Sequence, residues 1–178
     1  MPRASTELEI NRPPEQVFAL LHDYDRRLAW DPLLQQADII DGSLAAAKGV
    51  RTRCVGTWRS GGIGMETEYI SFDPGRVAAV SMCRPAPFFA RFVATIDHRP
   101  LPEGRSVVRY IYSFQARPRA LRWLLEPIMN AVLLRETRRR LAALKAYLEN
   151  KDSVPTVLPA PPPPRPIHPH SPQSGKAP

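Results

Sequence analysis

The side chains that commonly carry catalysis are few and scattered in this sequence. Cys54 lies on an alternating segment and is expected to point inward, but no histidine accompanies it as a base. His22 follows a short helical segment and His98 ends a predicted strand, so both are interpreted as partly exposed loop histidines. Glu66 and Glu68 are two residues apart, which places them on one solvated strand face. The sequence therefore predicts no catalytic residue.

Metal and cofactor chemistry is not indicated either. The histidines, cysteines and carboxylates have no metal-ligand spacing, and the two cysteines, Cys54 and Cys83, are too far apart in the chain for a C-x-x-C motif. Both are expected to be buried and reduced. The glycine-rich segment 60–64 is not followed by a helix whose N-terminus would hold a phosphate, so it is interpreted as a hairpin loop. We expect no metal and no cofactor.

The composition predicts a globular body with an unusual C-terminal tail. Of the 178 residues, 43% are hydrophobic and 24% are charged. Ten of the 21 prolines fall in residues 155–178, where missing donors and fixed φ angles exclude both helix and sheet. The chain is therefore divided into a folded domain over residues 1–150 and a disordered proline-rich tail over residues 151–178. Residues 161–166 of the tail either dock on a proline-reading domain or stay solvated.

Hydrophobic periodicity gives the order of the elements in the folded domain. Alternation predicts a strand over residues 6–11, and two short helical segments then follow as far as Trp30. Between residues 35 and 116, period-two segments separated by turn residues predict six strands with short, hence antiparallel, connections. Residues 119–149 are predicted to be helical. We expect a short helix, a bend near Pro127 and then a long helix.

Side-chain alternation indicates which residues face the core. In the segment 106–114, Arg109 must face water, so the opposite face, which carries aromatic side chains, is the inner one. The segment 65–72 breaks its alternation after Tyr69, which predicts a bulge. Residues 128–134 of the helix are apolar almost all round, so we expect protein to cover them on every side.

The ordered series of elements resembles a known superfamily. The residues that carry the resemblance are 10–21, Tyr24 through Trp30-Asp31-Pro32, 69–74, 101–110 and the helix end 141–149. They are similar to the START-like (SRPBCC) superfamily, and most of all to its polyketide cyclase/dehydrase and lipid-transport branch. The resemblance implies the α+β helix-grip fold, shared with the birch pollen allergen. In that fold a curved antiparallel sheet of about seven strands wraps around a long C-terminal helix, and two short helices follow the first strand.

The resemblance also implies a cavity between the sheet and the C-terminal helix. The candidate lining residues are those that alternation turns inward on the strands and those on the apolar stripes of the helix. These are Trp30, Trp58, Tyr69, Met82, Phe92, Tyr110, Tyr112, Phe114, Leu125, Met129 and Leu133. The alternative is that these side chains fill the space themselves and form an ordinary core.

Three functions remain open. The first, which we expect, is binding or transport of a small hydrophobic ligand such as a lipid, an isoprenoid or a polyketide-like compound. The second is a polyketide cyclase or aromatase, in which Tyr69, Tyr110 and Tyr112 would polarise carbonyl groups of a chain held in one conformation. The third is a non-catalytic interaction protein with a filled core, which would act through the tail and a basic helix face.

The net charge of +8 is concentrated on the C-terminal helix, where residues 117–145 carry eight Arg and Lys against two Glu. Arg138, Arg139 and Arg140 are interpreted either as a weak contact with an anionic membrane or as a solvated helix face. No base-reading motif accompanies the charge, so no nucleic-acid partner is predicted. Residues 1–7 have no apolar signal core, and we expect a cytoplasmic protein. The sequence does not define an oligomeric state.

Overall fold

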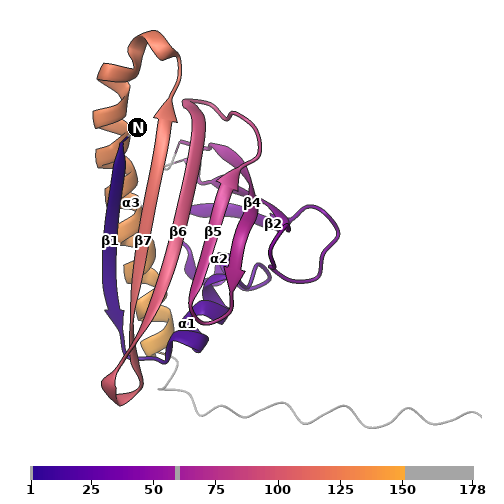
Figure 1. Cartoon of the computed structure of the whole chain (residues 1–178), viewed down its shortest axis with the longest axis vertical. Coiled ribbons are helices and arrows are strands. Elements are labelled where there is room, and N and C mark those ends of the chain that lie inside the picture. Colours follow the sequence, from indigo (N-terminus) through magenta and orange to yellow (C-terminus); the bar gives the residue numbers. More distant parts are fainter. Residues whose placement is uncertain (1, 59–60, 151–178) are drawn as a thin grey trace, which may run out of the picture.

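Seven antiparallel strands form one sheet in the order β1-β7-β6-β5-β4-β3-β2 (Figure 1). The computed structural model describes residues 2–58 and 61–150. Strands that follow one another in the chain from β2 to β7 are neighbours in the sheet, as short connections require. The strands are β1 Arg3–Ile10, β2 Leu34–Ile39, β3 Arg51–Gly56, β4 Gly64–Asp73, β5 Val77–Met82, β6 Phe89–Leu101 and β7 Arg105–Ala116. The predicted seven-stranded sheet is confirmed.

The helices are placed as the resemblance implies. Two short helices, α1 (Pro14–Leu21) and α2 (Arg27–Trp30), follow β1, and the 29-residue α3 (Arg122–Asn150) follows β7. Short 3-10 turns form η2 (Pro102–Gly104) and η3 (Arg119–Leu121). Helix α3 runs alongside β1 and β7 and contacts both strands (Figure 1). The α+β helix-grip fold is confirmed.

Alternation along β7 separates the core from solvent. Tyr110, Tyr112 and Phe114 are at most 8% exposed. Arg109, on the other face, is exposed and lies directly opposite Glu7 of β1, where the opposite charges favour the pairing. The predicted inner face of β7 is therefore confirmed, and it presents a row of rings toward α3.

A bulge in β4 changes which side chains point inward. The pairing of β4 with β5 shifts between Tyr69 and Ser71, so the predicted bulge is confirmed. In a regular strand, residues three apart would lie on opposite faces. Here the rings of Tyr69 and Phe72 meet edge to face with their centroids 5.3 Å apart. The bulge thus keeps Tyr69, which is 2% exposed, on the inside of the curved sheet.

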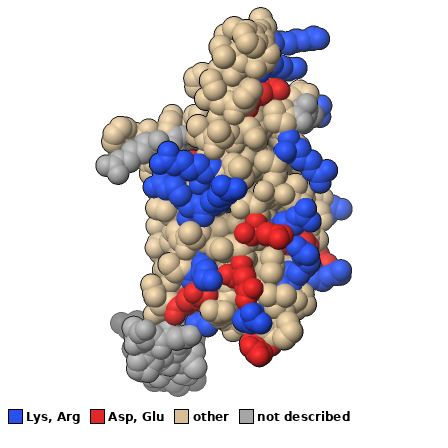
Figure 2. Space-filling view, turned by 90° about the vertical axis from the view of Figure 1, so that its left-hand side faces the viewer, with Lys and Arg blue, Asp and Glu red and all other residues tan. Residues whose placement is uncertain are grey.

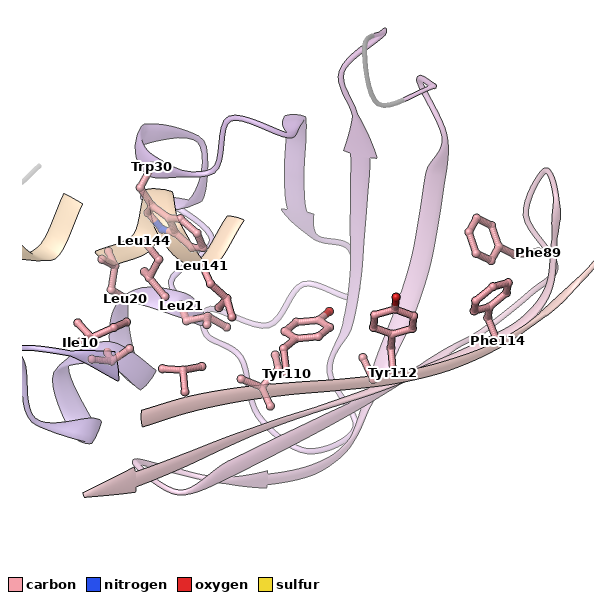
Figure 3. Packing of buried hydrophobic residues seen from close by; sticks show 14 of the residues in the cluster. Ile10, Leu20, Leu21, Trp30, Phe89, Tyr110, Tyr112, Phe114, Leu141 and Leu144 are labelled. Carbon is pink, nitrogen blue, oxygen red and sulfur yellow. The ribbon is translucent and has the colours of Figure 1, made fainter. Parts of the chain in front are cut away.

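The two halves of α3 are buried to different extents. Toward the C-terminus, Leu141 and Leu144 are at most 1% exposed and belong to the main core (Figure 3). Toward the N-terminus, Ile128 is 57% and Val132 is 54% exposed. The expectation that protein covers residues 128–134 on every side was wrong, because within residues 2–58 and 61–150 no further layer lies outside this half of the helix.

Helix α3 also continues through Pro127. The expected division into a short and a long helix was therefore wrong. Proline removes one backbone donor, and here it does so in the second turn of the helix. The loss of one hydrogen bond so near the start does not interrupt a helix whose other half is anchored in the core.

Candidate ligand-binding site

A cavity of about 340 Å³ lies between the sheet and α3, within the range of about 300–1,000 Å³ that small-molecule sites occupy. Six of the eleven predicted residues line it: Tyr69, Phe92, Tyr110, Tyr112, Met129 and Leu133. The four aromatic residues come from β4, β6 and β7. The two helix residues are four apart, so they share one face of α3. The sheet and the helix therefore each contribute one coherent wall.

The other five candidates lie outside the cavity wall: Trp30, Trp58, Met82, Phe114 and Leu125. Trp30 and Phe114 are at most 5% exposed and form part of the core behind the wall, and Met82 packs against the same core. Trp58 is 79% exposed, because β3 ends two residues earlier and alternation no longer determines where this side chain points. Leu125 is nearer to the N-terminus of α3 than any residue of that helix that lines the cavity.

The cavity opens beside the N-terminal half of α3. Three of its lining residues, Phe88, Ile128 and Val132, are more than half exposed. Phe88 belongs to the loop before β6 and has a φ of 65°, in the left-handed region that bulky residues rarely adopt. These three apolar side chains mark the mouth of the cavity, where its interior meets solvent.

Packed aromatic rings keep the inner wall in place. Phe92 stacks on Tyr112 with the ring centroids 6.3 Å apart, and Phe89 meets Phe92 edge to face at 6.1 Å. The hydroxyl of Tyr112 donates to the backbone oxygen of Asn130 on α3 at 3.2 Å. Figure 3 shows Tyr110 and Tyr112 projecting from the same side of β7. The wall is therefore formed before any ligand arrives.

At the end away from the mouth, three side chains form a hydrogen-bonded row. His22 Nδ1 lies 2.8 Å from Tyr69 Oη, which in turn lies 3.2 Å from Tyr24 Oη. His22 Nε2 is buried and has no partner among the described residues. A buried N–H without an acceptor is rarer than an unpaired lone pair, so we assign the proton to Nδ1. His22 then donates to Tyr69 and Tyr69 donates to Tyr24, whose hydroxyl lies at the cavity wall beside Thr52.

Burial keeps this row uncharged at neutral pH. It lowers the pKa of His22 well below 6.5, and the charges of Arg27 and His98 lower that pKa further. Burial also raises the pKa of Tyr69 above its usual value of 10, and the neighbouring Tyr24 raises it further. The row therefore offers neutral hydrogen-bond donors and acceptors to a ligand.

The interpretation of His22 and His98 as partly exposed loop residues was wrong. They are 6% and 3% exposed. The ring of His22 packs on that of Phe18, with the centroids 4.4 Å apart. Strand β6 runs three residues beyond the predicted end, as far as Leu101, so His98 lies inside a strand and faces the core with Ile96.

A shared carboxylate joins α2 to α3 at the same end of the cavity. Asp31 is 1% exposed, and its Oδ2 lies 3.1 Å from Arg27 Nε and 2.8 Å from Arg140 Nε. Its Oδ1 accepts a hydrogen bond from the backbone N–H of Leu33. Burial alone would raise the pKa of Asp31, but Arg140 and Arg27 outweigh that effect and hold the pKa below its usual value. Both arginines line the cavity.

The predicted face of Arg138, Arg139 and Arg140 is therefore corrected. Arg140 turns inward to Asp31, and Arg139 lies 3.2 Å from Glu136. Successive residues are about 100° apart around a helix, so three in a row span about 200° and do not share one face.

Several lining residues escaped the sequence reasoning. Tyr24 lies between α1 and α2, and its hydroxyl reaches the cavity only because this connection folds toward β4. Arg27 and Asp31 are four apart, a spacing typical of helical ion pairs, and this signal was available. Cys54 lines the cavity as a partly buried residue, whereas Cys83 is exposed, contrary to the expectation that both are buried.

A second hollow of about 410 Å³ lies on the other side of α1. Its lining includes three carboxylates, Glu15, Asp23 and Asp25, together with Leu44, which is 99% exposed. The cavity under α3 has one carboxylate in its lining, Glu136, and more aromatic rings, so it suits an apolar ligand better and is the candidate site.

Comparison with protein families decides which family the molecule represents. A family model described as polyketide cyclase / dehydrase and lipid transport matches residues 1–149. The chain belongs to this family. The resemblance found in the sequence is thereby confirmed. No curated protein matches the chain in sequence.

Solved structures share the fold of this family member at low sequence identity. A START superfamily protein from Mycobacterium smegmatis superposes with a TM-score of 0.71 and 11% identity, covering 84% of this chain and 98% of its own. The Zhui aromatase/cyclase from Streptomyces sp. R1128 gives 0.70 and 17%, covering 85% and 95%. The TTHA0849 protein from Thermus thermophilus gives 0.70 and 16%, covering 84% and 99%. At these identities the similarity shows the fold.

Neither a metal-ligand cluster nor a membrane-spanning helix is present in the described part of the chain. Among residues 2–58 and 61–150, no three His, Cys, Asp or Glu side chains lie close enough together to hold a metal ion. No helix in those same ranges combines the length and apolarity needed to cross a bilayer. The predicted proline-rich tail, with residues 161–166, lies outside the described residues.

The burial of His98 predicts a pH dependence of stability. Burial lowers the pKa of His98 from 6.5 to about 4. Between those two values the unfolded chain binds more protons than the folded one, so stability falls as the pH is lowered through this window. Between pH 7 and pH 5 the expected contribution is a loss of about 2 kcal/mol.

Urea unfolding of the wild type and of His98→Phe at both pH values measures this contribution. The variant should lose about 2 kcal/mol less than the wild type on acidification. Any packing change caused by the phenylalanine cancels in the difference between the two pH values. An equal loss in the two proteins would contradict the assignment.

Proposed function

We propose that this protein binds a small hydrophobic molecule, such as a lipid, an isoprenoid or a polyketide-like compound, in the cavity under α3. The observation that carries the proposal is a preformed cavity of about 340 Å³ with walls of aromatic, methionine and leucine side chains and one open end. The family description, which includes lipid transport, supports the same function. The cavity does not fit the alternative of an interaction protein with a filled core.

Apolar burial supplies the affinity. Each CH₂ group transferred from water to such a wall contributes about 0.8 kcal/mol. The stacked rings of Phe92 and Tyr112 need not rearrange to admit a ligand, so little of this gain is lost to ordering. The Tyr24 hydroxyl and the row behind it provide a polar contact that fixes the orientation of the ligand.

A polyketide cyclase of the family's type is the second candidate, and the same row favours it. Holding a flexible chain in one conformation is mainly a matter of positioning. Of the three tyrosines considered for carbonyl polarisation, Tyr69 belongs to the row, whereas the hydroxyl of Tyr112 already donates to Asn130. Tyr24 takes over the role of presenting a donor to the cavity.

Filling the cavity should abolish binding. Met129→Trp places a larger side chain on the helix wall, and the expected result is a loss of at least about tenfold in affinity for a fluorescent fatty acid. Ala131→Trp, on the exposed side of the same helix turn, is the matched control and should bind as the wild type does. Equal binding by Met129→Trp and Ala131→Trp, with both folded, would refute the cavity as the binding site.

We further propose that the ligand enters and leaves at an anionic membrane surface. Apolar side chains at the mouth, in η3 and in the N-terminal half of α3 are about half exposed or more: Phe88, Leu121, Trp123, Leu124, Ile128 and Val132. Arg135 and Arg138, farther along the same helix, are exposed as well. Figure 2 looks onto the side of the molecule formed by α3 and β1, where mostly uncharged side chains lie at the top and basic and acidic side chains are interspersed below. Apolar side chains beside cations suit the surface of an anionic bilayer.

Sedimentation with phosphatidylglycerol vesicles tests this surface. Ile128→Ser combined with Val132→Ser should reduce the bound fraction several-fold, because both side chains are more than half exposed at the mouth. Arg138→Gln should weaken binding at low salt and have little effect at high salt. Leu44→Ser removes a leucine that is 99% exposed in a distant loop and serves as the control. If the double serine variant sediments as the wild type does, the membrane proposal is wrong.

A further inference from the structure

The closed end of the cavity carries an excess of positive charge. Arg27 and Arg140 both line it, and a single carboxylate, that of Asp31, lies between them. The remaining carboxylate of the lining, Glu136, is 20% exposed and is paired with the more exposed Arg139, whose Nη1 lies 3.2 Å from it. The low pKa of His22 keeps that ring neutral. The two arginines and Asp31 thus leave one positive charge without a counter-ion from this end of the cavity.

The two arginines differ in how many of their N–H donors are already engaged by the protein. Arg27 donates from Nε to Asp31 and from Nη1 to the backbone oxygen of Leu21, and its guanidinium lies 4.7 Å from the centre of the Trp30 ring. Arg140 approaches Asp31 through Nε alone at 2.8 Å. This is an ion pair by distance only, because the buried Nε of Arg140 makes no hydrogen bond of acceptable geometry with the described residues. The fork of Arg140 is therefore the group with capacity for a ligand.

Polarity changes in one direction along the cavity. On α3 the lining residues run from Ile128, Met129 and Val132 at the mouth to Thr137 and Arg140 at the closed end. Twelve residues of helix span about 18 Å. An elongated ligand would therefore have apolar surroundings near the mouth and a guanidinium at the far end.

We infer that the ligand is an amphipathic molecule with one anionic oxygen group, such as a carboxylate, which Arg140 binds at the closed end while the apolar part points to the mouth. This inference rests on the proposed function, since it specifies what occupies the same cavity. A carboxylate accepts two parallel hydrogen bonds from a guanidinium, and it also neutralises the excess charge in a site from which water is largely excluded. A neutral ligand would do neither.

Two probes of equal chain length test the inference at pH 8, where the acid is ionised. Isothermal titration with dodecanoate and with dodecan-1-ol compares an anionic head with a neutral one on the same tail. In the wild type we expect dodecanoate to bind at least about tenfold more tightly. In Arg140→Gln the preference of the same protein for dodecanoate over dodecanol should fall below about threefold.

Control variants separate recognition from folding. Arg138→Gln removes an exposed arginine of the same helix and should keep the full preference. Arg140→Lys retains the charge near Asp31 but not the planar fork, and it should keep a preference intermediate between wild type and Arg140→Gln. If Arg140→Gln does not fold, the wild-type comparison and Arg140→Lys decide the question.

The outcomes distinguish this inference from the function on which it rests. Equal binding of acid and alcohol by the wild type would overturn the inference and leave hydrophobic binding standing. An acid preference that survives in Arg140→Gln would also overturn it, since another group would then hold the anion. No binding of either probe would overturn the proposed function and the inference with it.

Discussion

The packing of only one half of α3 determines the rest of the molecule. Leu141 and Leu144 are buried against the sheet, and this contact holds the helix at its C-terminal end. The N-terminal half meets β7 through polar contacts instead, such as that of Tyr112 with Asn130, and its Ile128 and Val132 stay more than half exposed. The space left between this half of the helix and the sheet is the cavity. Its mouth, its apolar end and the exposed side chains around it all follow from this asymmetry.

The ion pairs of Asp31 give the cavity its polar end and also fix the position of α2. A buried carboxylate is costly unless it is paired, and here two arginines from different elements share it. The arrangement ties the short helix α2, which has only four residues, to the long helix. It also leaves more positive than negative charge beside the cavity. One contact thus contributes both to the fold and to the chemistry of the site.

The sequence predicted the parts of the site that depend on local periodicity. The alternation of β7 predicts that Tyr110 and Tyr112 face the cavity, and the interrupted alternation of β4 predicts the bulge beside Tyr69. Trp58 was wrongly predicted to face the cavity because the strand ends before it, and strand alternation does not predict where a side chain points in a loop. Arg140 was misplaced for another reason: its partner, Asp31, lies far away in the chain, and no local pattern shows which of three adjacent arginines turns inward.

The central claim is that the hollow beneath α3 is a binding site. Native mass spectrometry of the protein purified under mild conditions, followed by extraction and identification of whatever it carries, tests this most directly. The account predicts a stoichiometric additional mass from an amphipathic molecule, absent when Met129→Trp is purified in the same way. A wild-type protein that carries no such mass, and that acquires none after incubation with a total extract of cellular lipids, would contradict it.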